Sequence, residues 1–391
     1  MRLLFSGLGI LIYTGLCTYI GARLFGFFRY FLPGIKAVSF WLPFILLSYA
    51  FIAVNFLRLN RLNFLRQFSG YWMAVFMYLL MSMIVFDLLR LALLLFKRSA
   101  LSPQFNAAGT AALLCLCFLA IAFGAVHARS IRTANYSVTV PGKGENLRIV
   151  LISDLHIGPA VNRAWVSRVA DTINRAEPDI VCIAGDVFDG NPDSAPDLPG
   201  IAAEFRRIQA PLGVYACLGN HDTDRMFGGG TGRITEFLQN AGVVVLQDET
   251  AAVRENLYIA GRRDARPIGM SASRKTAAEL LAGLDTGRGL DTGQDSDPSR
   301  TVIVLDHQPT QFAEIEQAGG DLALCGHTHK GQLFPANLMT RRIFKKAGGA
   351  YYGYWKGGAL QAVVTSGAGV WGPPIRVGTN SEAAVIDIRF E

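Results

Sequence analysis

The polar residues of this chain that could do chemistry follow short apolar runs. Five of its six histidines stand just beyond runs that are predicted to be strands, and Asp, Asn or Gly accompanies each of them. Because open α/β sheets bind ligands at the carboxyl ends of their strands, we expect these side chains to meet in one place. The residues at the successive exits are Asp154 and His156; Asp186 and Asp189; Asn220, His221 and Asp222; His307; and His327 and His329.

This donor set consists of carboxylate, carboxamide and imidazole groups, and none of the six cysteines forms a CxxC pair. Oxygen and nitrogen donors of this kind suit divalent Mn, Fe or Zn. The ligands are too many for one tetrahedral ion, whereas two ions about 3.5 to 4 Å apart, sharing a carboxylate and a hydroxide, would use all of them. Such a pair assists in-line displacement at phosphorus, so the pattern predicts metal-assisted phosphoryl chemistry.

The elements that must position these residues predict an α/β domain. Helical patterns at 164–176 and 201–208 alternate with apolar runs early in the domain, and later runs follow one another closely. This order predicts a two-sheet β-sandwich flanked by helices over residues 149–391. Residues 129–148 are predicted to be a linker or an opening strand. The predicted strands are 149–152, 180–184, 213–218, 243–246, 257–260, 301–305, 322–325, 362–365 and 384–388.

The first part of the chain has a different composition. Residues 1–148 contain 14 Lys and Arg but only two acids, Asp87 and Glu145, and most of the segment is apolar. Uncharged stretches of about 20 apolar residues are long enough to cross a bilayer as helices. We therefore predict an N-terminal four-helix transmembrane region at 1–128. Its spans are expected at 3–22, 37–57, 71–96 and 107–126.

The charges of this region favour a membrane over other partners. Its basic residues are assigned to loops between apolar segments, where they follow the positive-inside bias, so no nucleic-acid-binding patch is predicted. They fall almost equally on the two sides, which leaves the orientation open. In the third span, Asp87 and Arg90 share one helical face and are expected to neutralise each other. A transport path is the alternative, but one pair is too little for a conduit, so a packing role is favoured.

The ordered motifs also resemble a known family. The series D-x-H at 154–156, G-D-x-x-D at 185–189, G-N-H-D at 219–222, His307 after a strand and G-H-x-H at 326–329 is similar to that of the calcineurin-like metallophosphoesterases. The closing part, from Gly331-Gln332 through Gly367 and Arg376, resembles the bacterial membrane-associated branch related to YaeI and YkuE. The resemblance covers residues 147–391 and, together with the four predicted spans, implies a multi-pass protein of the bacterial cell membrane.

By this resemblance, the site would hold two divalent ions, with Mn favoured over Fe and Zn. A hydroxide between the ions would attack phosphorus in line, and His221 would act as general acid or charge stabiliser, oriented by Asp222. Asp186 would bridge the two ions. The first ion would be held by Asp154, His156, Asp186 and His329, and the second by Asp186, Asn220, His307 and His327.

Two further residues near the motifs, Asp189 and Arg376, have alternative roles in this scheme. Asp189 is predicted to support neighbouring groups or cap a loop rather than to bind metal. For Arg376 we weigh a contact with substrate phosphate against an ordinary surface salt bridge.

Three functions remain open at this stage. The first is a membrane-anchored phosphoesterase that hydrolyses a phosphodiester or a phosphomonoester. The second is a lipid-linked pyrophosphatase, acting on a nucleotide-diphosphate lipid of the UDP-diacylglucosamine type, because the spans keep the site near the bilayer. The third is a non-catalytic metal-binding membrane scaffold, against which the complete ligand set counts.

The substrate and the oligomeric state are left open. Pocket walls are expected from loops at 191–200, 225–233, 264–274 and 337–354. Basic residues in or just before two of these loops are candidates to grip an anionic head group or membrane lipids, with exposed, solvated charge as the default. They are Arg262, Arg263 and Arg266, and Arg341, Arg342, Lys345 and Lys346.

Overall fold

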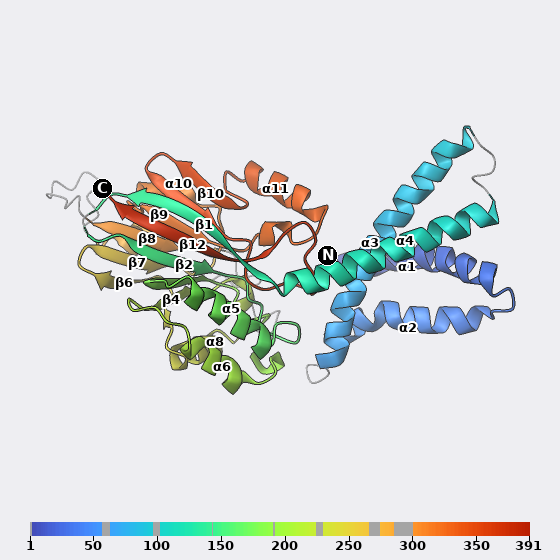
Figure 1. The fold of residues 1–391 in the computed structure, drawn as a ribbon, viewed down its shortest axis with the longest axis horizontal. Helices are drawn as coiled ribbons and strands as arrows, with labels where there is room; N and C mark the ends of the chain where they lie inside the picture. Colours follow the sequence, from blue (N-terminus) through green and yellow to red (C-terminus); the bar gives the residue numbers. More distant parts are fainter. Residues whose placement is uncertain are drawn as a thin grey trace. The chain divides into compact units, whose positions relative to one another are not determined.

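The computed structural model describes residues 2–56, 63–96, 102–142, 144–190, 192–223, 230–265, 274–284 and 300–391. The chain divides into two compact units, and Figure 1 labels most of their helices and strands. Unit 1 comprises Met1–Ala125 and Gly372–Ile375, and unit 2 comprises Val126–Trp371 and Arg376–Glu391.

Unit 1 is built from apolar helices, and the four predicted segments fall on four of them. Three helices are long and apolar enough to cross a membrane, over Gly7–Phe31, Phe64–Leu94 and Pro103–Ala128. The second helix has a shorter apolar stretch, Ala37–Ala50, so three rather than four described helices meet this requirement. The helices are α1 (Arg2–Phe31), α2 (Ala37–Phe56), α3 (Asn63–Leu94) and α4 (Pro103–Ala128).

The acid in α3 has a nearer partner than the sequence indicated. Asp87 Oδ1 lies 2.8 Å from Nη2 of Arg23 on α1, but 3.7 Å from Nη1 of Arg90. The hydroxyl of Tyr19 donates a 2.6 Å hydrogen bond to the other carboxylate oxygen. Arg23, which the sequence placed in a loop, is part of α1. Because these contacts join two helices, they support the packing role for Asp87.

Unit 2 confirms the predicted α/β architecture of two sheets. One sheet has the order β1-β12-β2-β3-β4-β5 and the other β10-β11-β9-β8-β7-β6. Both sheets are mixed, with parallel pairing among β2 to β5 and among β7, β8, β9 and β11. The strands of the first sheet are β1 (Ile131–Val140), β2 (Leu147–Ile152), β3 (Ile180–Ala184), β4 (Val214–Cys217), β5 (Val244–Val245) and β12 (Ser381–Phe390). Those of the second are β6 (Glu249–Arg254), β7 (Leu257–Gly261), β8 (Thr301–Leu305), β9 (Leu322–Cys325), β10 (Gly353–Gly357) and β11 (Leu360–Val364).

The core explains why the central strands are continuous apolar runs. Ile149 on β2 and Ile303 on β8 are buried between the two sheets, in one hydrophobic cluster. Their neighbours Val150 and Val302 point the other way, because successive side chains of a strand alternate between its faces. Each central strand is therefore buried on both faces, as is usual for parallel sheets.

Helices cover the outer face of each sheet. Trp165, Ile201 and Ile234, from three different helices, pack on the first sheet, and Leu280 and Phe312 pack on the second. The predicted helical patterns at 164–176 and 201–208 correspond to α5 and α6. The helices of unit 2 include α5 (Arg163–Arg175), α6 (Leu198–Arg206), α7 (Asn220–Thr223), α8 (Thr231–Asn240), α9 (Ala277–Leu281), α10 (Phe312–Gln317) and α11 (Ala336–Lys346).

The structure agrees with the sequence prediction at one connection and differs from it at two others. The segment 129–148, predicted as a linker or an opening strand, contains the strand β1, which pairs with β12 over its whole length. The predicted loop at 337–354 begins with helix α11, and the loop at 191–200 includes the start of α6. Residues 225–229 and 266–273 of the other predicted loops lie outside the described residues.

Candidate metal centre

The predicted ligands stand where the strands of both sheets end. Asp154 and Asp186 follow β2 and β3 of the first sheet, and His307 follows β8 of the second. Three groups of side chains come together there with donor atoms within 4.8 Å of one another. The groups are Asp154, His156 and His329; Asp186, His307 and His327; and His156, Asp189 and His221.

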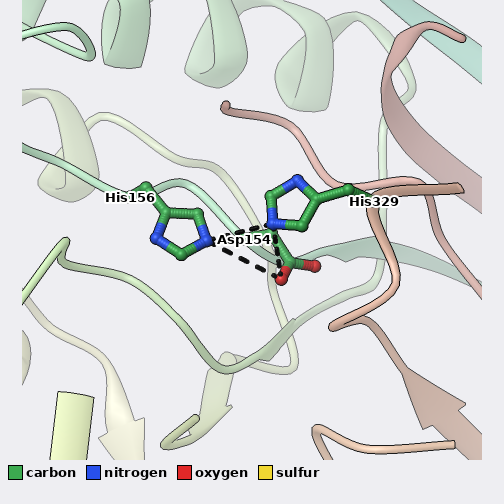
Figure 2. A group of neighbouring side chains, drawn as sticks. All are labelled: Asp154, His156 and His329. Atoms are coloured by element: carbon green, nitrogen blue, oxygen red, sulfur yellow. Dashed lines mark hydrogen bonds and ion pairs between the residues drawn. The ribbon is translucent and has the colours of Figure 1, made fainter. Parts of the chain in front are cut away.

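The first group joins one strand exit from each sheet, as Figure 2 shows. Nε2 of His329 lies 3.4 Å from Oδ1 of Asp154 and 3.1 Å from Nε2 of His156. All three side chains are buried. Burial, with further contributions from His156 and Arg376, holds the pKa of His329 well below its usual value. A neutral imidazole is the form that binds a metal.

The second group is held by a backbone contact. Nδ1 of His307 donates a 2.7 Å hydrogen bond to the carbonyl oxygen of Ala184, which leaves Nε2 of this ring free to accept or bind. That Nε2 lies 3.2 Å from Oδ2 of Asp186 and 3.3 Å from Nδ1 of His327. His307 is fully buried.

Asp186 is the point at which the two groups meet. Its Oδ2 lies 3.2 Å from Nε2 of His307 and 3.7 Å from Nε2 of His156, one histidine from each group. Its Oδ1 accepts a 2.8 Å hydrogen bond from the backbone N–H of His221. Burial raises the pKa of Asp186, but His307, His156 and His221 outweigh it and hold this pKa below its usual range. The carboxylate is therefore ionised.

Asn220 begins the short helix α7, next to this meeting point. Its side chain is buried, and its Oδ1 has no hydrogen-bond partner among the described residues. Nδ1 of His329 is also buried and also has no hydrogen-bond partner among the described residues. Buried polar atoms without partners are rare in folded proteins and call for a ligand, an ion or water. The oxygen and nitrogen donors of the site thus fit a pair of divalent cations.

Asp189 and Asp222 make different contacts around His221. Oδ1 of Asp189 lies 3.4 Å from Nδ1 of His221 and 3.7 Å from Nδ1 of His156. The carboxylate of Asp222 accepts backbone N–H bonds from Val187, Phe188 and Gly219, at 3.1, 2.9 and 3.0 Å. That Asp222 orients His221 stays a prediction, and Asp189 has the contact that such a role requires.

Burial, helped by the negative charge of Asp186, raises the pKa of Asp222 to about 6. The pKa of Asp189 is shifted in the opposite direction. Burial raises its pKa, but His156 and His221 outweigh burial and bring the pKa below its usual range. For His221, burial lowers the pKa, and Asp189 and Asp186 together raise it above the usual value.

The backbone at the predicted ligands is strained. A positive φ is uncommon for residues other than glycine and costs about 1–3 kcal/mol. Five predicted ligands adopt it among the described residues, with φ between 49° and 70°. They are Asp154, His156, Asp186, His327 and His329. Strain of this kind concentrates at functional sites, because there the direction of the side chain matters more than a low-energy backbone conformation.

Two motif glycines allow close approach at the site. A Cβ at Gly219 would collide with the carboxylate and backbone of Asp186, and a Cβ at Gly326 would collide with the side chains of Ser153 and Asp154. The glycines of G-N-H-D and G-H-x-H are therefore needed for packing against the neighbouring motif.

Arg376 has neither of the two roles weighed from the sequence. Its side chain is fully buried and donates hydrogen bonds to the carbonyl oxygens of Ser366 at 2.7 Å, Gly369 at 2.8 Å and His329 at 3.3 Å. Burial lowers the pKa of this guanidinium to about 10. The hydrogen bonds of Arg376 therefore join the loop after β11 to the G-H-x-H turn and have a structural role.

The basic residues that the sequence suggested for binding an anionic head group differ in how exposed they are. Arg262 is buried and pairs with Asp306 at 3.2 Å and Glu314 at 2.7 Å, so it cannot grip a ligand in solution. Arg263 remains half exposed, and Arg266 lies outside the described residues. The four basic residues of α11, by contrast, are all exposed.

Comparison with known proteins agrees with the donor chemistry. Residues 147–331 match the family model of the calcineurin-like phosphoesterases. An uncharacterized metallophosphoesterase of Campylobacter jejuni is 30% identical over 262 residues, which cover 64% of this chain and 62% of that protein. This chain thus spans less than two thirds of that relative.

Two further relatives bear on the rest of the chain. A transmembrane protein with metallophosphoesterase domain from Danio rerio is 27% identical over 355 residues, covering 87% of this chain and 77% of that protein. The uncharacterized metallophosphoesterase YkuE of Bacillus subtilis is 26% identical over 265 residues, covering 65% of this chain and 82% of that protein. These matches, together with the histidine and aspartate groups at the strand ends, show that residues 147–331 of the chain are similar to the calcineurin-like phosphoesterases.

Proposed function

We propose that this protein is a membrane-anchored phosphoesterase that uses two divalent metal ions to hydrolyse a phosphodiester or a phosphomonoester. The observation that supports it most is the position of Asp186, whose carboxylate lies between His156 of the first group and His307 of the second. A shared carboxylate is what a two-ion phosphoryl-transfer site requires.

The proposed ligand sets are those implied by the sequence motifs. Bound there, two divalent ions supply charge neutralisation for the phosphoryl oxygens and activation of a water molecule. Mn is the favoured metal, with Fe and Zn as alternatives that suit the same donors. The ligands are Asp154, His156, Asp186 and His329 for one ion, and Asp186, Asn220, His307 and His327 for the other.

In the proposal, the remaining residues of the site act on protons and orientation. His221 faces the scissile phosphate and protonates or stabilises the departing oxygen. Asp189 keeps the ring of His221 in position through Nδ1, which it approaches to 3.4 Å. Asp222 acts on the same residue indirectly, because it fastens the exits of β3 and β4 to each other through three backbone N–H groups.

The proposed organisation places a membrane anchor at residues 1–128 and the catalytic domain at 149–391. The apolar helices, of which three described ones are long enough to cross a bilayer, would make the protein a multi-pass protein of a bacterial cell membrane, in the branch that includes YkuE. The last turn of α4 already belongs to unit 2, since Ala128 accepts a 2.6 Å hydrogen bond from the Ser381 hydroxyl at the start of β12. Only Arg129 and Ser130 separate α4 from β1.

This short connection favours a second candidate for the substrate, a lipid-linked pyrophosphate such as a nucleotide-diphosphate lipid. A domain that begins at the end of a membrane span meets lipid phosphates at high local concentration. The two candidates share the same metal chemistry and differ in the leaving group.

The test is phosphate or nucleotide release by the full chain in detergent micelles or nanodiscs with added Mn²⁺. We expect cleavage of an aryl phosphodiester or monoester, and loss of this activity in Asp186→Ala. Comparing a water-soluble diester with a membrane-embedded pyrophosphate separates the two candidates. Unchanged turnover in His221→Ala would remove the proposed role of that residue, and less than one bound ion per chain in a folded preparation would favour a non-catalytic scaffold instead.

A further inference from the structure

Helix α11 leaves its apolar side chains in solvent. Its residues include no buried side chain, whereas α5 and α8 of the same unit bury an apolar stripe against the first sheet. Leu338, Met339 and Ile343 are 59%, 64% and 53% exposed. Met339 and Ile343 stand one helical turn apart and therefore share a face. Single exposed apolar residues are ordinary, but a contiguous group marks an interaction surface.

Two exposed aromatic residues extend this surface. Phe334, just before α11, is 52% exposed, and Trp371 is 51% exposed. The side chain of Gln332 exchanges two 2.9 Å hydrogen bonds with the backbone of Trp371, which holds Trp371 beside the segment leading into α11. We call Phe334, Leu338, Met339, Ile343 and Trp371 the α11 patch.

The charges around the patch favour a negatively charged partner. Helix α11 carries four basic residues and no acid, and all four are exposed. They are Arg341, Arg342, Lys345 and Lys346. A helix whose exposed side carries both apolar and basic residues suits the headgroup layer of an anionic membrane. A second copy of the chain would bring like charges together if the same patches met, so it is a poor occupant.

Unit 2, which carries the patch, is joined directly to a candidate membrane span. The last turn of α4, a candidate membrane span, is part of unit 2. His127 in that turn lies 2.9 Å, through Nε2, from Oδ1 of Asn380, just before β12. A surface on a domain that begins at the end of a span meets lipid at a high effective concentration, so weak contacts suffice for docking.

The patch adjoins the candidate metal centre. The ring of Phe344, on the inward side of α11, has its centroid 6.1 Å from that of His327. The ring of Trp371 lies 5.9 Å from that of His221. Residues of the same segments thus touch the site and form the exposed surface. Docking this surface would bring the rim of the site to the headgroup layer.

We propose that the α11 patch is a membrane-docking surface that inserts at the boundary between headgroups and acyl chains of an anionic bilayer. The basic residues of α11 bind anionic headgroups, while Met339, Ile343 and Trp371 enter the apolar boundary. The inference concerns where the surface lies, not turnover, so it stands or fails independently of the phosphoesterase proposal.

The test measures the depth of single labels in the full chain. An environment-sensitive fluorophore is attached to Ile343→Cys in a Cys115→Ser background, because Cys115 is the one exposed cysteine among the described residues. The matched control carries the label at Gln239→Cys, an exposed position on α8, whose apolar stripe is buried. Both proteins are placed in nanodiscs of phosphatidylcholine and phosphatidylglycerol in equal amounts, and in nanodiscs of phosphatidylcholine alone.

We expect a nitroxide on the lipid acyl chains to quench the label at Ile343 much more than the label at Gln239, and iodide to show the reverse order. Quenching at Ile343 should fall in pure phosphatidylcholine. It should also fall when the four basic residues are changed to Gln, since each contributes about fivefold to binding an anionic surface. These changes lie on the exposed side of α11 and should leave hydrolysis of a soluble ester unchanged.

Two outcomes would overturn the proposal. If the labels at Ile343 and Gln239 respond alike to lipid nitroxide and to iodide, the patch stays in water. If the label at Ile343 is shielded from both quenchers, protein covers the patch, and a second copy or another chain takes the place of lipid.

Discussion

Oδ1 of Asp189 lies 3.4 Å from Nδ1 of His221, so the carboxylate facing this histidine comes from the exit of a neighbouring strand. The adjacent residue in the chain, Asp222, directs both oxygens to backbone N–H groups. The two acids therefore serve different purposes. Asp189 contacts the imidazole to which we assign a catalytic role, and Asp222 holds two loops together through their backbone.

The first prediction concerns Asp189. We expect Asp189→Asn to lower kcat about 10- to 100-fold with a small change in KM, because losing a supporting carboxylate misplaces a reacting ring without removing it. Steady-state kinetics at saturating Mn²⁺ measure this split. A variant whose kcat equals that of the unchanged protein would show that His221 needs no such support.

Asp222 should behave in the opposite way. Asp222→Ala leaves three buried N–H groups without a partner, each costing about 1–3 kcal/mol of the free energy of unfolding. We expect a clear fall in the Tm of the full chain in detergent. The matched variant Asp193→Ala removes an exposed pair with Arg233 and should change Tm little. Equal Tm values for the two variants would contradict the structural role of Asp222.

Metal content should follow the two histidine groups. We expect His329→Ala and His327→Ala each to reduce the metal bound per chain by about one ion, since each removes a ligand from a different group. Elemental analysis after dialysis measures this content. A chelator should abolish hydrolysis, and added Mn²⁺ should restore it. If one variant removed all bound metal and the other none, the assignment of two separate ions would fail.

Arg376 should matter for folding more than for substrate. Arg376→Met removes a buried cation that binds several carbonyl oxygens. Hydrogen bonds from a charged group contribute about 1.5–3 kcal/mol each, so we expect a large loss of thermal stability. Arg376→Lys should recover only part of it, because an ammonium group lacks the planar fork of donors. A variant with normal Tm and raised KM would restore the phosphate-contact interpretation.

The contribution of Glu204, on α6, to the stability of the protein should depend on pH. Its carboxylate accepts hydrogen bonds from Arg163 at 3.1 Å and Arg207 at 3.0 Å. Burial raises the pKa of Glu204, but the two guanidinium groups outweigh burial and lower it. The pKa is therefore lower in the folded state than in the unfolded one. The resulting stability is present above about pH 4.3 and is lost as pH falls through the folded-state pKa.

We accordingly expect Glu204→Gln to lower Tm at pH 7, with a difference that shrinks as the buffer becomes more acidic than about pH 4. A series of melting curves across this range provides the measurement. A difference that grows toward acid would mean that the pKa of Glu204 is raised rather than lowered.

The sequence predicted the strand ends better than their surroundings. Asp154 and His307 were recognisable because a polar residue at the end of an apolar run has few structural reasons to be there. The separation of such residues along the chain did not matter, since parallel strands bring their carboxyl ends to one edge. The same logic found β2, β3, β8 and β9, which are apolar on both faces.

Residues whose role depends on tertiary contacts were not predictable in this way. Arg376 lies in a Gly- and Pro-rich segment whose composition gives no sign that its side chain is buried. Edge strands β6 and β10 were missed because they are short and partly exposed, without a clear apolar alternation. Helix α11 was read as part of a loop because its apolar residues do not form a stripe that faces the protein.

The position of β12 has a consequence for how the domain is made. This strand lies between β1 and β2, although it is synthesised roughly 230 residues after β2. Until the ribosome has produced it, the first two strands of the domain have no shared neighbour, and their edges stay open while α4 is already complete. Long-range pairing of this kind is slow to form. We therefore expect the late arrival of β12 to limit folding of the first sheet, with the edges of β1 and β2 exposed to non-native pairing until then.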